Sequence, residues 1–212
     1  MSKHIYQRRP VEQSALPNVI FALLVANGLV FAAQQLMRTT RFVEAHFALW
    51  PLDSVGYEFQ FWQLVTYGFL HSPDNLTHIL FNMFGLWMFG RDIEWVLGSK
   101  RFLIYYLTCV VGAGIVQLTV AAVQGHAYPT LGASGGVFGL LLAYAMFFPN
   151  RTVMLLFPPI PMKAKYFVLA YGLLELYLGV SGRAPGIANF AHLGGMFFGY
   201  VLLKRWQHAR RP

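Results

Sequence analysis

Charged side chains are scarce in this sequence. Asp, Glu, Lys and Arg make up 11% of its 212 residues, and 57% are hydrophobic, whereas soluble domains carry roughly a quarter charged residues. None of the four charged types occurs between Phe102 and Asn150. This run is about twice the ~20 residues that one membrane-spanning helix needs, so it excludes an ordinary soluble domain and predicts two spans. The turn between them falls at residues 125–130, GHAYPT, where Gly and Pro interrupt the apolar pattern.

Cysteine is nearly absent as well. The single Cys109 lies within an apolar segment, which excludes a framework of disulfide bonds. The sequence also shows no internal repeat, no low-complexity tract and no soluble domain of useful size. We expect a cytoplasmic N-terminal tail at residues 1–15, one membrane domain at residues 16–206 and a cytoplasmic C-terminal tail at residues 207–212.

Six apolar segments predict an all-α membrane protein, a bundle of six transmembrane helices. The first segment follows Lys3, Arg8 and Arg9, as a secretory signal would. It is longer than the apolar part of a typical signal and contains Asn18 and Asn27, so we interpret it as an uncleaved span. The expected helices cover residues 16–37, 75–97, 101–124, 133–149, 163–181 and 187–205.

The Lys and Arg residues are divided unequally between the two sides of these spans. With the N-terminus inside, the inner segments hold twelve of the sixteen: Lys3, Arg8, Arg9, Lys100, Arg101, Arg151, Lys163, Lys165, Lys204, Arg205, Arg210 and Arg211. The outer loops hold Arg38, Arg41 and Arg183, and Arg91 lies near the inner end of the second helix. Since cytoplasmic loops are enriched in Lys and Arg, we expect a multi-pass protein of the cell (inner) membrane with both termini in the cytoplasm. This bias explains most of the net charge of +8, so no nucleic-acid partner is expected.

The first outer loop, residues 38–73, is much longer than a tight connection needs. It is dense in aromatic residues: Phe42, Phe47, Trp50, Tyr57, Phe59, Phe61, Trp62, Tyr67 and Phe69. Rings at this density outside a span indicate a segment that lies in the headgroup region of the bilayer. Anchoring of the fold by an aromatic belt and a direct part in handling a substrate both remain open.

Polar side chains within the spans gather near the outer side. His78 and Asn82 are four residues apart and therefore share a helix face. At ~1.5 Å per residue, these two side chains, Ser134 and His192 all lie within about 10 Å of the outer edge, so we expect them to share one layer. Glu175 and Gln117 are each isolated within their own helix.

This layer contains the groups that acyl transfer requires. A serine hydroxyl becomes a strong nucleophile when an imidazole takes its proton, and Asn, His and backbone N–H groups can stabilise the oxyanion that follows. A single Ser or His in a span is more often structural, because each readily bonds a neighbouring backbone or helix. The combination of Ser134 and His192 with two further donors favours catalysis.

Glycines surround the serine in the stretch LGASGGVFG. Gly132, Gly135, Gly136 and Gly139 would let the backbone approach a substrate, although small residues at this spacing also fit close helix packing. For Gly195 and Gly199 packing is the interpretation we adopt. GASGG also matches the G-x-S-x-G elbow of soluble hydrolases, but that motif requires a strand before the serine, and the flanks here have the length and composition of membrane helices.

Four motifs in order carry a family resemblance: HILFN, GRDIEWVLG, GASG and AHLGGMFFG. With them the sequence resembles the rhomboid intramembrane serine proteases of the compact six-helix bacterial type, from about Phe61 to Gly199. The resemblance implies that Ser134 is the nucleophile and His192 the general base, a dyad with no orienting carboxylate. It also implies an oxyanion hole formed by His78, Asn82 and the Ser134 backbone N–H.

The resemblance further implies that Glu94 is structural and ties the inner end of the second helix. Two positions depart from the family pattern. Gln63 follows Trp62 where an arginine is common, and Phe138 replaces a tyrosine that stacks on the catalytic histidine. The ring can still stack, but the hydroxyl is lost. The stretch HSPDNLTH is slightly longer than in some relatives, so no role is assigned to His71.

The function that we expect is an endopeptidase that cleaves transmembrane segments of other, single-pass membrane proteins within the lipid bilayer. No metal or cofactor is required by this chemistry. One alternative is a catalytically silent relative that binds and retains membrane proteins. Another is a small transporter, although the polar residues cluster on one side and no inverted repeat is visible.

Overall fold

Helices dominate the computed structural model, which describes residues 17–36, 40–125, 128–154, 159–184 and 186–209. The expected N-terminal tail lies outside these residues. In the part of the chain that the structure describes, six helices of at least 14 residues lie within a few residues of the expected ranges: α1 (Asn18–Leu36), α4 (Leu76–Leu97), α5 (Ser99–Gln124), α6 (Ser134–Phe147), α7 (Ala164–Ser181) and α8 (Asn189–His208). α6 ends two residues before the expected position because Pro149 follows and disfavours helix at the residue before it.

Several shorter elements were not predicted. The long segment before α4 contains α2 (Thr40–Phe47), α3 (Gln63–Thr66) and the 3-10 turn η1 (Tyr67–Phe69). Between α6 and α7, the strands β1 (Thr152–Met154) and β2 (Pro161–Lys163) pair antiparallel, so the fold is mostly rather than entirely helical. Three prolines between Phe157 and Met162 disfavour a helix in this connection, which explains the difference.

Two of the described helices, α1 and α5, are long and apolar enough to cross a membrane by themselves, and α6 is apolar but shorter. The remaining long helices contain charged side chains, among them Asp92 and Glu94 in α4 and Glu175 in α7. Each of these three carboxylates is buried. A buried carboxylate requires a partner. Those of Glu94 and Glu175 include donors from other helices, whereas Asp92 pairs with Arg151 in the turn between α6 and β1.

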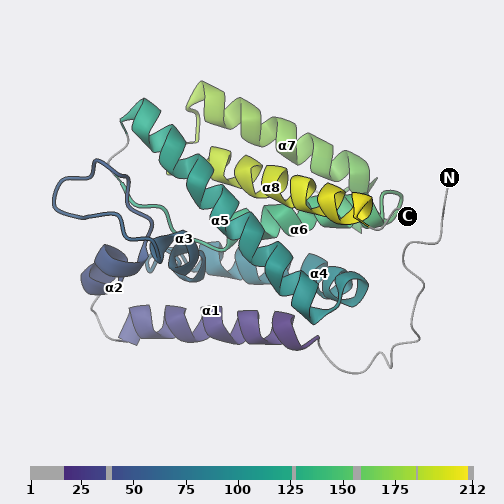
Figure 1. Ribbon diagram of the computed structural model, residues 1–212, viewed down its shortest axis with the longest axis horizontal. Helices are drawn as coiled ribbons and strands as arrows, with labels where there is room; N and C mark the ends of the chain where they lie inside the picture. The colour runs from purple at the N-terminus through teal and green to yellow at the C-terminus, as the bar shows by residue number, and fades with distance from the viewer. Residues whose placement is uncertain (1–16, 37–39, 126–127, 155–158, 185, 210–212) are drawn as a thin grey trace.

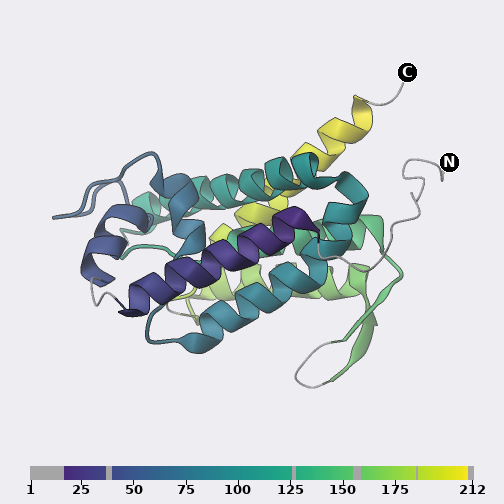
Figure 2. The ribbon, with the colours of Figure 1, turned by 90° about the horizontal axis from the view of Figure 1, so that it is seen from below.

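The long helices form one bundle, in which α8 lies beside α5, α6 and α7 (Figure 1). α1 begins and α8 ends at the same end of the bundle, and α2 and α3 lie at the opposite end (Figure 1). The view from below shows α1 crossing in front of the bundle and the β1–β2 hairpin projecting beside α7 (Figure 2). α8 approaches α5 closely at Gly112, where an added Cβ would lie 2.3 Å from the Phe198 ring.

Glu94 joins α4 to the start of α1. Its two carboxylate oxygens accept hydrogen bonds from the backbone N–H groups of Val19 at 3.1 Å and Ile20 at 2.8 Å. The Ser99 hydroxyl donates a third bond at 2.6 Å. N–H groups in the first turn of a helix have no partner within the helix, and a negative charge there is favourable. Glu94 therefore stabilises the helix start and fixes α1 against α4.

His71 is buried in the segment that leads into α4. Its backbone N–H and C=O both bond the Gln34 amide of α1 at 3.1 Å. Its ring packs edge to face on His78, with 5.1 Å between centroids. Neither ring nitrogen has a hydrogen-bond partner among the described residues. Burial, with a smaller contribution from the nearby His78 ring, lowers the pKa of His71 from its ordinary 6.5 to about 4.

Replacement of Glu94 tests the link between α4 and α1. Glu94→Gln keeps the shape but loses the charge and one acceptor, so we expect a loss of about 2 kcal/mol of stability. Unfolding in detergent can be followed with a maleimide dye that reacts with the buried Cys109, the single cysteine of the chain. Glu58→Gln, at an exposed position, is the matched control. Equal melting of both variants would contradict the role of Glu94.

The lowered pKa of His71 predicts a stability that depends on pH. Between about pH 6.5 and pH 4 the unfolded chain binds a proton that folded His71 does not, so stability falls as the pH falls through this window, by up to about 3 kcal/mol. Above pH 6.5 the group has no effect. The Cys109 dye assay should show a smaller acid-induced drop for His71→Leu than for the unaltered chain. Parallel pH curves for the two proteins would refute the prediction.

Candidate active site

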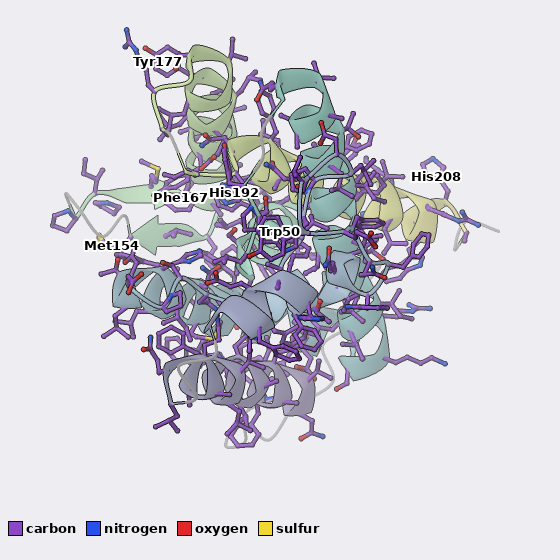
Figure 3. The ribbon with its side chains drawn as sticks, turned by 90° about the vertical axis from the view of Figure 1, so that its left-hand side faces the viewer. Trp50, Met154, Phe167, Tyr177, His192 and His208 are labelled. Atoms are coloured by element: carbon purple, nitrogen blue, oxygen red, sulfur yellow. The ribbon has the colours of Figure 1, made fainter. Side chains whose placement is uncertain are left out.

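Ser134 and His192 are in direct contact. Ser134 is the first residue of α6 and His192 the fourth of α8, and the His192 Nε2 atom lies 2.8 Å from the Ser134 Oγ atom. Figure 3 shows His192 near the centre of the bundle, whereas Tyr177 lies at its periphery on α7. An imidazole at hydrogen-bond distance from a serine hydroxyl is the arrangement that activates serine as a nucleophile.

The backbone immediately before Ser134 requires glycine. Gly132 has φ +126°, which side-chain-bearing residues rarely adopt, and an added Cβ would lie 2.8 Å from the His78 Nε2 atom. Its N–H donates to the Tyr67 carbonyl at 2.9 Å, which fixes the loop before α6. Glycine at this position therefore lets the His78 ring lie directly against the chain that leads into the serine.

The hydrogen bonding of His78 defines its tautomer. The Ser72 backbone N–H donates to His78 Nδ1 at 3.3 Å. In a neutral imidazole one nitrogen accepts and the other donates, so Nε2 carries the proton. Because Nε2 faces Gly132, the structure gives His78 an N–H donor beside the start of α6. Such a donor can stabilise negative charge that develops near Ser134.

Asn82 lies one turn after His78 and is buried. Its side-chain Nδ2 donates to the His78 carbonyl at 2.8 Å. The amide nitrogen has a second hydrogen, so this bond does not exhaust its capacity to donate. The first N–H groups of α6, beginning with Ser134, also lack partners within the helix. Two side chains and one helix start thus supply candidate donors for an oxyanion.

The Phe138 ring lies flat on the His192 ring. The centroids are 4.2 Å apart, and the planes differ by 4°. Phe138 is one turn after Ser134 on α6, so the helix that carries the serine also holds the plane of the imidazole. The expected stack is present without a tyrosine hydroxyl.

Glycines set the separation of α6 and α8. An added Cβ on Gly195 would lie 2.0 Å from the Gly135 carbonyl oxygen, and one on Gly139 would lie 3.2 Å from the Gly195 carbonyl oxygen. An added Cβ on Gly199 would lie 2.4 Å from the Tyr105 hydroxyl of α5. Distances below 3 Å leave no room for a side chain. Gly135 and Gly195 therefore permit the backbone contact that brings Ser134 within reach of His192, and Gly199 permits the approach of α8 to α5.

Sequence reasoning missed one neighbour of His192. Glu175 of α7 places its Oε2 atom 3.0 Å from His192 Nδ1, and Asn189 donates to the same oxygen at 2.6 Å. The family resemblance implied a dyad without a carboxylate, so this contact departs from that expectation. The signal available in the sequence was the spacing of Asn189 and His192, which are three apart and share a helix face toward which an intramembrane acid could turn.

A cavity of about 530 Å³ connects these groups. His78, Asn82, Gly132, Ser134, Phe138 and His192 all line it, together with loop residues that include Tyr128 and Ile187. The four polar residues expected to share one layer are thus brought to one cavity. Gln63, the departure noted in the first loop, lies elsewhere: it is buried, and its amide bonds the backbone of Trp50, His46 and Glu58.

Comparison with known proteins gives consistent results. A sequence model of the rhomboid domain matches residues 58–205. The chain is 29% identical over 189 residues to mitochondrial Rhomboid protein 1 of Saccharomyces cerevisiae, covering 87% of this chain and 52% of that protein. It is 32% identical over 148 residues to Rhomboid protease GluP of Bacillus subtilis, covering 66% of this chain and 25% of that protein.

The chain is also 29% identical over 160 residues to the putative rhomboid protease YdcA of Bacillus subtilis, covering 73% of this chain and 74% of that protein. It spans about half the length of the yeast relative and a quarter of GluP. The domain match covers more than half of the chain and includes the whole of the Ser134 and His192 region. The chain therefore belongs to the rhomboid family.

Proposed function

We propose that this protein is an intramembrane serine endopeptidase that uses Ser134 as nucleophile and His192 as general base. The observation that carries the proposal is the 2.8 Å contact between Ser134 Oγ and His192 Nε2 at the wall of a cavity. Two of the relatives bear the name rhomboid protease. Because both members of the reactive pair are present and in contact, a protease is favoured over a silent binding protein.

The chemistry follows from the positions of these groups. The Ser134 Oγ atom attacks the carbonyl carbon of a peptide bond while its proton moves to His192 Nε2. The carbonyl electron pair moves to the oxygen, where His78 Nε2–H, the Asn82 amide and the Ser134 backbone N–H can stabilise it. The C–N bond then breaks, the amine takes the proton from His192, and an acyl-enzyme remains. Water then attacks the acyl carbon as its proton moves to His192 Nε2, the C–Oγ bond breaks, and His192 returns the proton to Ser134.

The arrangement in the membrane is the second part of the proposal. We infer six spans, both termini in the cytoplasm and the long aromatic loop in the outer headgroup region, from the unequal Lys and Arg distribution. α6 has 14 residues, or ~21 Å, against a hydrocarbon core of ~30 Å. If the C-terminal end of α6 lies at the cytoplasmic surface, a helix this short does not reach the outer surface. Its first residue, Ser134, would then lie within the bilayer and close to the outer face.

The substrates that we propose are single-pass membrane proteins. In a regular helix the backbone peptide groups are hydrogen-bonded to one another. A transmembrane segment must therefore unwind locally before Ser134 can reach a carbonyl carbon. Transmembrane segments weakened by Gly or Pro near their outer end satisfy this requirement. A small residue at the cleavage position fits a site whose walls are formed by closely packed helices.

The activated serine can be tested without knowledge of the natural substrate. We expect the detergent-purified protein to gain one adduct from a fluorophosphonate, measured by intact mass. Ser134→Ala should abolish the adduct, and His192→Ala should slow it by at least ~100-fold because the general base is lost. Protection of Cys109 from a maleimide dye shows that each variant is folded. A folded but unlabelled unaltered protein would overturn the proposal and favour the silent binder.

A further inference from the structure

We propose that Glu175 is a positioning residue that orients the His192 ring and stabilises its protonated form during catalysis. This inference rests on the proposed function, because it concerns the same Ser134 and His192 pair. With Glu175, the expected dyad becomes a triad of serine, histidine and carboxylate, and its members come from three helices, α6, α8 and α7.

The contact is close and buried. The Glu175 Oε2 atom lies 3.0 Å from His192 Nδ1, and the two residues expose only 7% and 8% of their surface. Nδ1 is the ring nitrogen opposite the one that contacts Ser134 at 2.8 Å. A carboxylate on that side favours the tautomer with hydrogen on Nδ1. The lone pair of Nε2 is then free to accept the serine proton.

Asn189 holds the carboxylate in place. Its Nδ2 atom donates to Glu175 Oε2 at 2.6 Å, and it lies three residues before His192 on the same face of α8. Although the two atoms are 3.0 Å apart, His192 Nδ1 makes no hydrogen bond in this structure. Catalytic hydrogen bonds are often poorly aligned in unliganded enzymes and tighten when the substrate binds.

The charge of Glu175 has no other counter-ion among the described residues. Its only ion-pair contact there is His192, which is cationic only when protonated. A buried carboxylate near an imidazole therefore favours the imidazolium that forms when Ser134 loses its proton. Phe138 fixes the plane of the ring from one face. Glu175 fixes the rotation of the ring within that plane.

Glu175 does not change the path of the proton in this reaction. The Ser134 proton moves to His192 Nε2 as the Oγ–C bond forms, and the same proton later moves to the leaving amine as the C–N bond breaks. Glu175 keeps its negative charge throughout and takes up no proton. It acts only by attraction to the transient positive charge on the ring and by holding Nδ1–H.

A structural alternative is that Glu175 only tethers α7 to α8 through Asn189. Two variants separate the roles. Glu175→Gln keeps an oxygen that can accept the Asn189 bond but removes the charge. Glu175→Asp keeps the charge on a side chain shorter by one methylene. Glu58→Gln, which removes an exposed carboxylate, is the matched control.

The rate of the fluorophosphonate reaction is the first readout. We expect Glu175→Gln to react about 10- to 100-fold more slowly, less than the ~10⁴-fold loss that follows the equivalent change in soluble serine proteases. Glu175→Asp should recover part of the rate. All three variants should protect Cys109 as the unaltered protein does.

The second readout is independent of activity. In protein with ¹⁵N-labelled histidine rings, the His192 signals, assigned by their loss in His192→Ala, should show hydrogen on Nδ1. In Glu175→Gln the hydrogen should shift in part to Nε2. A tether alone would not alter this tautomer.

The outcomes distinguish the inference from the proposed function. Labelling of the unaltered protein at Ser134, with Glu175→Gln reacting at the same rate and with the same tautomer, would overturn the role of Glu175 and leave the dyad intact. Equal slowing of the Gln and Asp variants would also overturn it, because the charge would then not matter. Absence of labelling in folded, unaltered protein would overturn both.

Discussion

The contact between the backbones of α6 and α8 is the constraint on which the site depends. Gly135 and Gly195 meet where a single added methyl group would lie 2.0 Å from a carbonyl oxygen. Ser134 precedes this point by one residue and His192 by three, so the crossing of the two helices decides the distance between the hydroxyl and the imidazole. Helix association within lipid relies on such close packing, because apolar side chains gain little from leaving an equally apolar solvent. The packing of α6 against α8 therefore also sets the geometry of the Ser134 and His192 pair.

Hydrogen bonds between helices also hold the bundle together. Glu94 joins α4 to the first turn of α1, and Glu175 joins α7 to α8 through Asn189. Each of these carboxylates is buried and each is held by donors from another helix, which offsets the cost of burying its charge. Two polar side chains near Ser134 are held by backbone groups instead: His78 Nδ1 accepts from the Ser72 N–H, and Asn82 donates to the His78 carbonyl. These hydrogen bonds hold both side chains at the wall of the cavity.

Much of this architecture follows from local features of the sequence. Long apolar runs bounded by Gly, Pro and charged residues define the six long helices. The depth of the polar residues in these runs predicted one layer for His78, Asn82, Ser134 and His192, and the structure brings all four to one cavity. Their catalytic roles stay predictions. The short β1–β2 hairpin and the helices α2 and α3 lacked a periodic signal long enough to recognise. The spacing of Asn189 and His192 marks the face of α8 that an acid could approach, but it does not identify Glu175 as that acid, because the contact depends on the rotation of α7 against α8.

The most direct test of this account is the fluorophosphonate reaction rate of Gly195→Ala. Gly172→Ala is the matched control, since an added Cβ there meets only the Met196 methyl at an ordinary 3.6 Å. The account predicts that Gly195→Ala, in protein that still protects Cys109, reacts about 100-fold more slowly, because a displacement near 1 Å can cost that much. Gly172→Ala should react like the unaltered protein. Unchanged reactivity of Gly195→Ala would show that the glycine contact does not set the distance between Ser134 and His192.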